Sequence, residues 1–245
     1  MTKKFRTHIS ASGLELPVEI TLEPRRDTRF GITGKRVTLR LPMGVQPDFI
    51  QRQLAELQVW VHKVLLEKPA LREPFLGKTY QTGDVLEVGH RRYVLDVSIE
   101  ERGSHSGKLI GDTIHLQLSN KSTPAHLTRA VKTLLSRVVA GDFYPEIRRR
   151  VLDWNDRTFR QYIKSINLKY NHSNWGSCSA RNNVNLSTRL LFAPYDVQDY
   201  VILHELAHLV ELNHSDRFWS LVESNMPDYR EKEKWLKTNR TKCDF

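Results

Sequence analysis

Two histidines and a glutamate lie close together in the run His204-Glu205-Leu206-Ala207-His208. Residues four apart share one face of an α-helix, so both imidazoles would point to the same side and could bind one tetrahedral metal ion. Glu205 lies about 100° further round the helix, where it is poorly placed to ligate but can accept a proton from water at the metal. The pattern predicts a zinc-dependent hydrolase, with His204 and His208 as ligands and Glu205 as the catalytic base.

A catalytic zinc site needs three protein ligands and one open position, and His214 is the favoured third ligand. On an unbroken helix His214 would lie about 15 Å along the axis from His204. The chain must therefore leave the helix after His208 and fold back. Asn213 tolerates a left-handed conformation, and Ser215 can cap a new helix that begins at residue 216. Glu223 is the alternative third ligand, as in sites built from two histidines and one glutamate.

The helix that carries the motif is predicted to be buried. Apolar residues occupy much of its circumference between Tyr195 and Leu212, and Pro194 suits the helix start. A single histidine on such a helix is usually a hydrogen-bonded core residue. Three ionisable groups would be costly to bury without a partner, and a metal ion removes that conflict. Among the other histidines, His172 is nearest in sequence and is a candidate substrate contact.

The first half of the chain is predicted to be rich in strands. Apolar and polar residues alternate with period two in several segments, and a long apolar stripe at helical spacing follows Pro47. We expect strands at 14–22, 37–41, 85–88, 93–99 and 113–118, and a helix at 47–67. Residues 1–122 are therefore expected to form a mostly β N-terminal region with one helix.

From residue 123 the pattern changes to helix. One helix is expected from Pro124 to about Gly141, and a second from Tyr144 to about Phe159. Short strands at 162–170, 175–179 and 184–187 precede the motif helix, with a hairpin turn over 180–183. Residues 123–245 are expected to form a helical domain, although the two parts could be one continuous unit. The predicted fold class is α+β.

Composition and charge restrict the function classes. No segment approaches the roughly 18 consecutive apolar residues of a membrane helix, and the N-terminus lacks the apolar region of a secretory signal. Cys178 and Cys243 form no metal-binding pair and are expected to be free thiols, so we expect a cytoplasmic protein with no membrane partner. The net charge of +10 is compatible with nucleic acid as a partner but also with an ordinary basic surface.

The chain resembles the YgjP-like metallopeptidase domain family, whose members are predicted metal-dependent hydrolases related to SprT-like and other zincin peptidases. The resemblance is carried by Trp175-Gly-Ser-Cys-Ser179, Asn185-Leu186, Arg189-Leu-Leu-Phe-Ala-Pro194, His204-Glu-Leu-Ala-His208, Asn213-His214-Ser215, Phe218-Trp219, Met226-Pro-Asp-Tyr229 and Trp235-Leu236. It is dense between residues 175 and 236. It implies a zincin-like fold, with His204, His208 and His214 as ligands and Glu205 as the catalytic base.

The predicted function is zinc-dependent hydrolysis of amide bonds in a peptide or protein substrate. Zinc would activate a water molecule, and Glu205 would take its proton and pass it to the leaving amine. Trp175 and Asn185 are candidate substrate contacts, and the strand at 184–187 could pair with an extended peptide. Two alternatives stay open: a SprT-like protease that docks on DNA through its basic surface, and a non-catalytic module that zinc stabilises.

Overall fold

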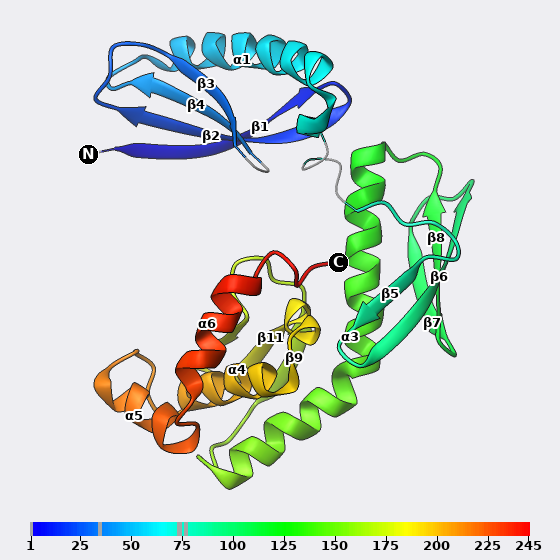
Figure 1. Cartoon of the computed structure of the whole chain (residues 1–245), viewed down its shortest axis with the longest axis vertical. Helices are drawn as coiled ribbons and strands as arrows, with labels where there is room; N and C mark the ends of the chain where they lie inside the picture. Colours follow the sequence, from blue (N-terminus) through cyan, green and yellow to red (C-terminus); the bar gives the residue numbers. More distant parts are fainter. Residues whose placement is uncertain (1, 34–35, 73–74, 76–77) are drawn as a thin grey trace. The chain divides into compact units, whose positions relative to one another are not determined.

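The structure is a computed structural model that describes residues 2–33, 36–72, 75 and 78–245. It is a mixed α+β protein with two compact units (Figure 1). The first unit comprises Met1–Thr79 and Ser122–Thr128, and the second comprises Tyr80–Lys121 and Arg129–Phe245. The sequence analysis placed the division after residue 122, whereas the strands between residues 85 and 119 share a unit with the C-terminal elements.

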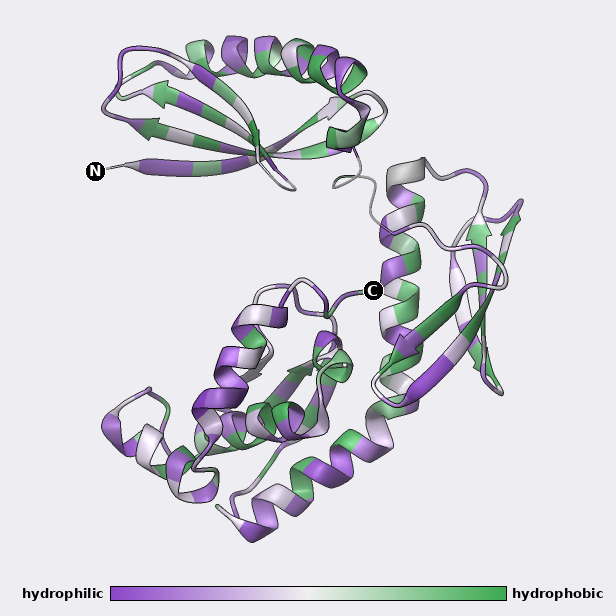
Figure 2. Cartoon of the chain, viewed as in Figure 1, coloured by the Kyte–Doolittle hydropathy of each residue, from purple (hydrophilic) through white to green (hydrophobic). Residues whose placement is uncertain are grey.

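The first unit is a four-stranded sheet with one helix packed on it. The elements are β1 (Lys3–Ala11), β2 (Leu14–Glu23), β3 (Arg29–Thr33), β4 (Arg36–Pro42), α1 (Pro47–Glu67) and the short 3-10 helix η1 (Pro69–Arg72), with strand order β1-β2-β4-β3. Hydrophobic and hydrophilic residues alternate along the strands (Figure 2), so that one face of the sheet is apolar. Leu16 and Leu39 from that face form a core with Leu57, Val61 and Leu65 of α1.

The second unit begins with another four-stranded sheet, which packs against a long helix. Its strands are β5 (Val85–Val88), β6 (Arg91–Glu100), β7 (Ser106–Ile110) and β8 (Thr113–Ser119), in the order β5-β6-β8-β7. The helix is α3 (Pro124–Arg157). A Cβ at Gly107 of β7 would lie 3.3 Å from Leu134 and 3.4 Å from Val138, so the sheet and the helix are in close contact there. Tyr93 of β6 also donates a hydrogen bond to Asp142 of α3.

The two helices expected around Gly141 are a single 34-residue helix, so the predicted break is wrong. Gly141 costs helix stability but does not end the helix, and Pro145 lies inside it. A proline within a helix removes one backbone hydrogen bond and crowds the preceding turn, which bends the helix. Figure 1 shows α3 changing direction along its length. Tertiary packing has overridden the two local break signals.

The remaining elements of the second unit surround the predicted metal motif. They are β9 (Ser165–Lys169), β10 (Gly176–Cys178), β11 (Asn183–Ser187), η2 (Thr188–Phe192), α4 (Tyr195–Ala207), α5 (Asp216–Asn225) and α6 (Tyr229–Asn239). The strand order is β10-β11-β9, with β11 antiparallel to β10 and parallel to β9. The predicted turn between β10 and β11 is confirmed, and Asn182 within it has a φ of 58°.

The central place of β11 corrects one expectation. Both of its edges are occupied by neighbouring strands, so residues 184–187 cannot accept a substrate strand. β10 and β9 are the edge strands instead, and β10 is the one that contacts Glu205.

Across the described residues, no helix is long and apolar enough to cross a membrane.

Candidate metal centre

Helix α4 lies in the core of the second unit and presents the motif at its C-terminal end. Val197, Val201, Leu203 and Leu206 are each less than 4 % exposed, as the apolar circumference of the segment predicts. Pro194 precedes the helix as its N-cap, also as predicted. His208 is the C-cap residue, so the two motif histidines occupy the last turn of α4 and the position directly after the helix.

The chain leaves the helix after Ala207 and returns to it through a tight turn, which confirms the predicted break. The N–H groups of Val210 and Glu211 both donate to the carbonyl of Ala207. Helix α5 then begins at Asp216, where the Ser215 hydroxyl accepts a hydrogen bond from the N–H of Phe218. The left-handed conformation suggested for Asn213 is wrong, because Ser12, Arg160 and Asn182 are the only described non-glycine residues with a positive φ.

The turn brings His214 back to the two motif histidines. One ring nitrogen from each of His204, His208 and His214 lies within 4.8 Å of the others. The Nε2 atoms of His204 and His214 are 3.0 Å apart. Ligands 2.0–2.1 Å from a tetrahedral zinc ion are about 3.3 Å from each other, so this spacing fits zinc. Glu223, the alternative third ligand, does not belong to this group.

The hydrogen bonding of His208 fits the same site. Its Nδ1 atom lies 3.0 Å from the carbonyl oxygen of Glu211, which can only accept a hydrogen bond. Nδ1 is therefore the protonated nitrogen, and Nε2 is left with a free lone pair for a metal ion. A backbone carbonyl that orients a ligating imidazole in this way is the usual outer contact of a zinc histidine.

An aromatic cluster fixes the three imidazole rings. Phe218 of α5 is fully buried, and its ring centroid lies 4.8 Å from His204, 4.4 Å from His208 and 4.8 Å from His214. Trp219 lies 5.7 Å from His214 and stacks on Tyr229 at 5.4 Å. Phe218 therefore helps to position the three rings, a part that the sequence did not indicate, since Phe218-Trp219 stood out only in the family resemblance.

Burial favours the neutral, metal-binding form of the His204 and His208 imidazoles. Burial first, and then the neighbouring His208 and His214, lower the pKa of His204 to about 3. Burial also lowers the pKa of His208. The Nδ1 atom of His204 is buried and has no hydrogen-bond partner among the described residues. A protonated imidazole there would bury an uncompensated charge, so His204 can act as a lone-pair donor but not as a cation.

Glu205 lies about 100° further round α4 than His204 and packs against β10, next to the cavity that both residues line. Its side chain is only 5 % exposed, and burial raises the pKa of its carboxyl to about 8. The backbone N–H of Cys178 donates to it and offsets part of that shift. A Cβ at Gly176 would lie 2.5 Å from the Glu205 Oε1 atom, so the carboxylate occupies the space that a side chain at residue 176 would take. Gly176 is a further residue that sequence reasoning did not single out.

Trp175 is held beside this carboxylate by a buried arginine. The Arg189 side chain is almost fully buried and donates hydrogen bonds to the carbonyls of Cys243, His172 and Arg240. Its guanidinium carbon lies 4.9 Å from the centre of the Trp175 ring. Arg189 thus joins the loop before β10 to the end of α6, and sequence reasoning gave it no such part.

A cavity of about 280 Å³ opens beside the motif, between β10, α4 and α6. Trp175, Gly176, Val201, His204, Glu205 and Leu236 are among the residues that line it. The cavity therefore includes one predicted ligand, the predicted base and one predicted substrate contact. A larger cavity of about 630 Å³ lies between α3 and β9, away from the histidines.

The other predicted site residues lie outside this cavity. The Asn185 side chain bonds to Ser177 and to Asn167 within the sheet, so its predicted contact with substrate stays a prediction. The His172 ring is exposed, and its carbonyl accepts from Arg189. Cys178 is a half-buried free thiol, as expected, and burial raises the pKa of this thiol to about 11, which makes it a poor nucleophile.

Comparison with known protein families identifies the family of the chain. The model of the YgjP-like metallopeptidase domain matches residues 26–239, and the chain belongs to that family. No curated protein gave a match.

Two solved structures are weakly similar, both of them metallopeptidase zymogens. Abylysin of Pyrococcus abyssi is 22 % identical with a TM-score of 0.35, over 38 % of this chain and 92 % of its own. Jannalysin of Methanocaldococcus jannaschii is 20 % identical with a TM-score of 0.34, over 38 % of this chain and 94 % of its own.

Proposed function

We propose that this protein is a zinc-dependent metallopeptidase with a zincin-like second unit, in which His204, His208 and His214 hold the metal and Glu205 is the general base. The observation that carries the proposal is the convergence of three imidazole nitrogens within 4.8 Å beside a buried carboxylate. Three histidine ligands leave one tetrahedral position open, as catalytic zinc sites require. Membership of a metallopeptidase family favours peptides as substrates.

A bound zinc ion would supply Lewis-acid chemistry, acidifying a water molecule and polarising the substrate carbonyl. Glu205 would accept the proton of that water on a carboxylate oxygen. Its raised pKa suits it to hold the proton and then to donate it to the leaving amine. The burial that raises this pKa also excludes bulk water from the carboxylate, so that the proton is kept at the reacting centre.

The edge strand β10 would bind the substrate backbone. β10 is hydrogen-bonded on one side only and lies next to Glu205 through Gly176. An extended peptide added to that edge would place its backbone beside the proposed base. This assigns to β10 the part that the sequence analysis gave to residues 184–187.

The test compares the wild-type protein with Glu205→Gln. Each protein is purified, its zinc content is measured, and it is incubated with a mixture of unrelated peptides whose fragments are identified by mass spectrometry. We expect the wild type to hold about one zinc per chain and to hydrolyse peptides. Glu205→Gln should keep the zinc and the melting temperature but lose at least about 100-fold in kcat, since general base catalysis contributes roughly 10²–10⁴-fold.

The same measurement separates the proposal from a non-catalytic zinc module. In a module that zinc only stabilises, wild type and Glu205→Gln would behave alike and neither would cleave any peptide. That result would reject the peptidase assignment while leaving the metal site intact.

A further inference from the structure

We infer that the cavity between β10, α4 and α6 is a specificity pocket that accepts a large apolar side chain, such as leucine or phenylalanine, from the substrate residue next to the cleaved bond. The inference rests on the proposed peptidase function and adds to it the class of residue that is recognised. The cavity measures about 280 Å³, which is room for one side chain but not for a folded partner.

The cavity adjoins the proposed catalytic residues. His204 and Glu205 line one end of it, and Gly176 of the edge strand lines it as well. A peptide on β10 with its scissile carbonyl beside the three histidines would therefore direct a neighbouring side chain into the cavity.

The inner walls are apolar and held in place. Tyr200, Val201 and Leu236 are each 5 % exposed or less, so they cannot move away without disrupting the core. The fourth wall, Trp175, stacks on the buried Arg189 guanidinium. A preformed apolar pocket of this kind favours a large hydrocarbon side chain over alanine because it removes more apolar surface from water.

The rim disfavours a basic side chain. Glu233 lies on the lining, but its carboxylate already pairs with Lys237 Nζ at 2.7 Å. Arg240 is also on the lining and donates hydrogen bonds to the carbonyls of His172 and Ser173. The rim thus carries two cations, Lys237 and Arg240, and one carboxylate, Glu233, so its net charge is positive. A lysine or arginine side chain of the substrate would be repelled at the entrance.

The first experiment measures the preference of the wild-type protein. A cleaved peptide is resynthesised with phenylalanine, leucine, alanine or lysine at each position flanking the scissile bond, and kcat/KM is measured for every peptide. At one of these positions we expect kcat/KM for the phenylalanine and leucine peptides to exceed that for the alanine peptide by roughly 10–100-fold. The lysine peptide should have the lowest kcat/KM. Zinc-loaded Glu205→Gln, which should bind without cleaving, should show the same order in Kd by calorimetry.

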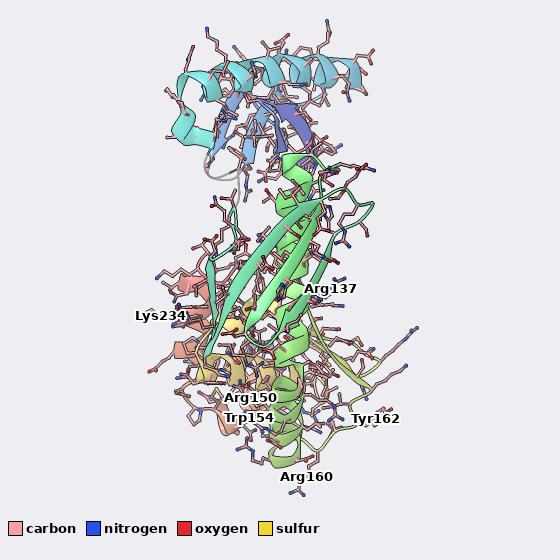
Figure 3. The ribbon with its side chains drawn as sticks, turned by 90° about the vertical axis from the view of Figure 1, so that its right-hand side faces the viewer. Arg137, Arg150, Trp154, Arg160, Tyr162 and Lys234 are labelled. Atoms are coloured by element: carbon pink, nitrogen blue, oxygen red, sulfur yellow. The ribbon has the colours of Figure 1, made fainter. Side chains whose placement is uncertain are left out.

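The second experiment changes the pocket. Val201→Phe should fill the cavity and reduce the ratio of kcat/KM for phenylalanine over alanine at least tenfold. Lys237→Glu reverses a rim charge and should raise the ratio of lysine over phenylalanine at least tenfold. Lys234→Glu is the matched control, because Lys234 is an exposed residue of the same helix (Figure 3). It is not among the residues that line the cavity. Its ratios should equal those of the wild type.

Each ratio compares two peptides hydrolysed by the same preparation. Unfolded, inactive protein lowers both rates equally and leaves the ratio unchanged. Peptide hydrolysis that depends on Glu205 but shows no preference for large apolar residues would overturn the pocket assignment and leave the proposed function standing. The same holds if Val201→Phe and Lys237→Glu keep the wild-type ratios. If no peptide is hydrolysed by the wild type, the proposed function fails and the pocket assignment fails with it.

Discussion

At the scale of single residues, the contact between Gly176 and Glu205 sets how the candidate base is placed. The two residues come from different elements, and the carboxylate of Glu205 fills the volume in front of the Gly176 Cα atom. Gly176 does not have a positive φ, so the backbone alone would accept any residue there. Space, not backbone conformation, makes glycine necessary at this position.

We predict that Gly176→Ala impairs catalysis without removing the metal. The added Cβ would lie 2.5 Å from Glu205 Oε1, so the carboxylate must shift. A displacement of about 1 Å in a catalytic group can cost on the order of 100-fold in rate. Measured kcat should fall at least tenfold, with zinc content unchanged. Gly103→Ala serves as the control, since a Cβ there meets nothing within 4 Å. Unaltered kcat in Gly176→Ala would contradict the position assigned to Glu205.

A second prediction concerns the identity of the third ligand. His214→Ala should weaken zinc binding by more than the roughly 10–100-fold that follows loss of an outer contact, because it removes a direct ligand. Glu223→Gln should bind zinc like the wild type, since Glu223 lies with Asp216, Trp219 and Arg230 in a separate surface hollow. Both affinities can be measured by competition with a zinc-binding dye. If Glu223→Gln weakened zinc binding and His214→Ala did not, the ligands would be two histidines and Glu223 instead.

At the scale of elements, the helix that carries the motif and the elements next to it could be predicted from the sequence, but their packing against one another could not. The shared face of His204 and His208 follows from helix geometry, and the return of His214 was inferred from the need for a third zinc ligand. The contact of Glu205 with Gly176 depends on how the hairpin of β10 and β11 packs against α4, and these segments are far apart along the chain. The aromatic support from Phe218 likewise needs the orientation of α5, which local sequence does not fix.

The long helix α3 shows the opposite case, a local pattern that tertiary structure overrides. Gly141 and Pro145 fall within one helical turn of each other, and together they indicate a helix end. The helix continues because apolar residues on both sides of the turn, such as Val139, Phe143 and Ile147, are buried in one core. Burial of this stripe outweighs the cost of one glycine and one missing hydrogen bond.

The strand β1 was missed although a pattern was present. Phe5, Thr7, Ile9 and Ala11 alternate with polar residues, but four of the first eight residues are basic or histidine. These charged residues made the alternation of apolar and polar residues difficult to recognise as a strand pattern. Pairing with β2 along its whole length stabilises this strand, and a tight turn at Ser12 and Gly13 joins the two strands in a hairpin.

We predict that Gly141→Ala stabilises the protein, which tests the continuity of α3. Alanine in a helix interior is favoured over glycine by about 0.5–1 kcal/mol, and a Cβ at residue 141 meets nothing within 4 Å. The free energy of unfolding from urea titration should rise by about that amount. A decrease would mean that residue 141 is a true helix end. Zinc content and kcat should stay at wild-type values, because residue 141 is not part of the candidate site.

At the scale of the whole molecule, the candidate metal site belongs to one of the two compact units. The first unit has its own core between a sheet and α1, and the three histidines, Glu205 and the cavity all belong to the second unit. Each unit therefore has its own source of stability. A ligand that binds only the folded second unit can stabilise only that unit directly.

We therefore predict that heating unfolds the protein in two steps and that zinc shifts only one of them. Zinc at about 1,000 times its Kd should stabilise the second unit by roughly 4 kcal/mol, which corresponds to a rise in Tm on the order of 10 °C. Differential scanning calorimetry with zinc and with a chelator would resolve the two transitions. His214→Ala should abolish the zinc-dependent shift and leave the other transition unchanged. A single transition that moves as a whole with zinc would show that the two units unfold together, and that the stability of the first depends on the metal bound by the second.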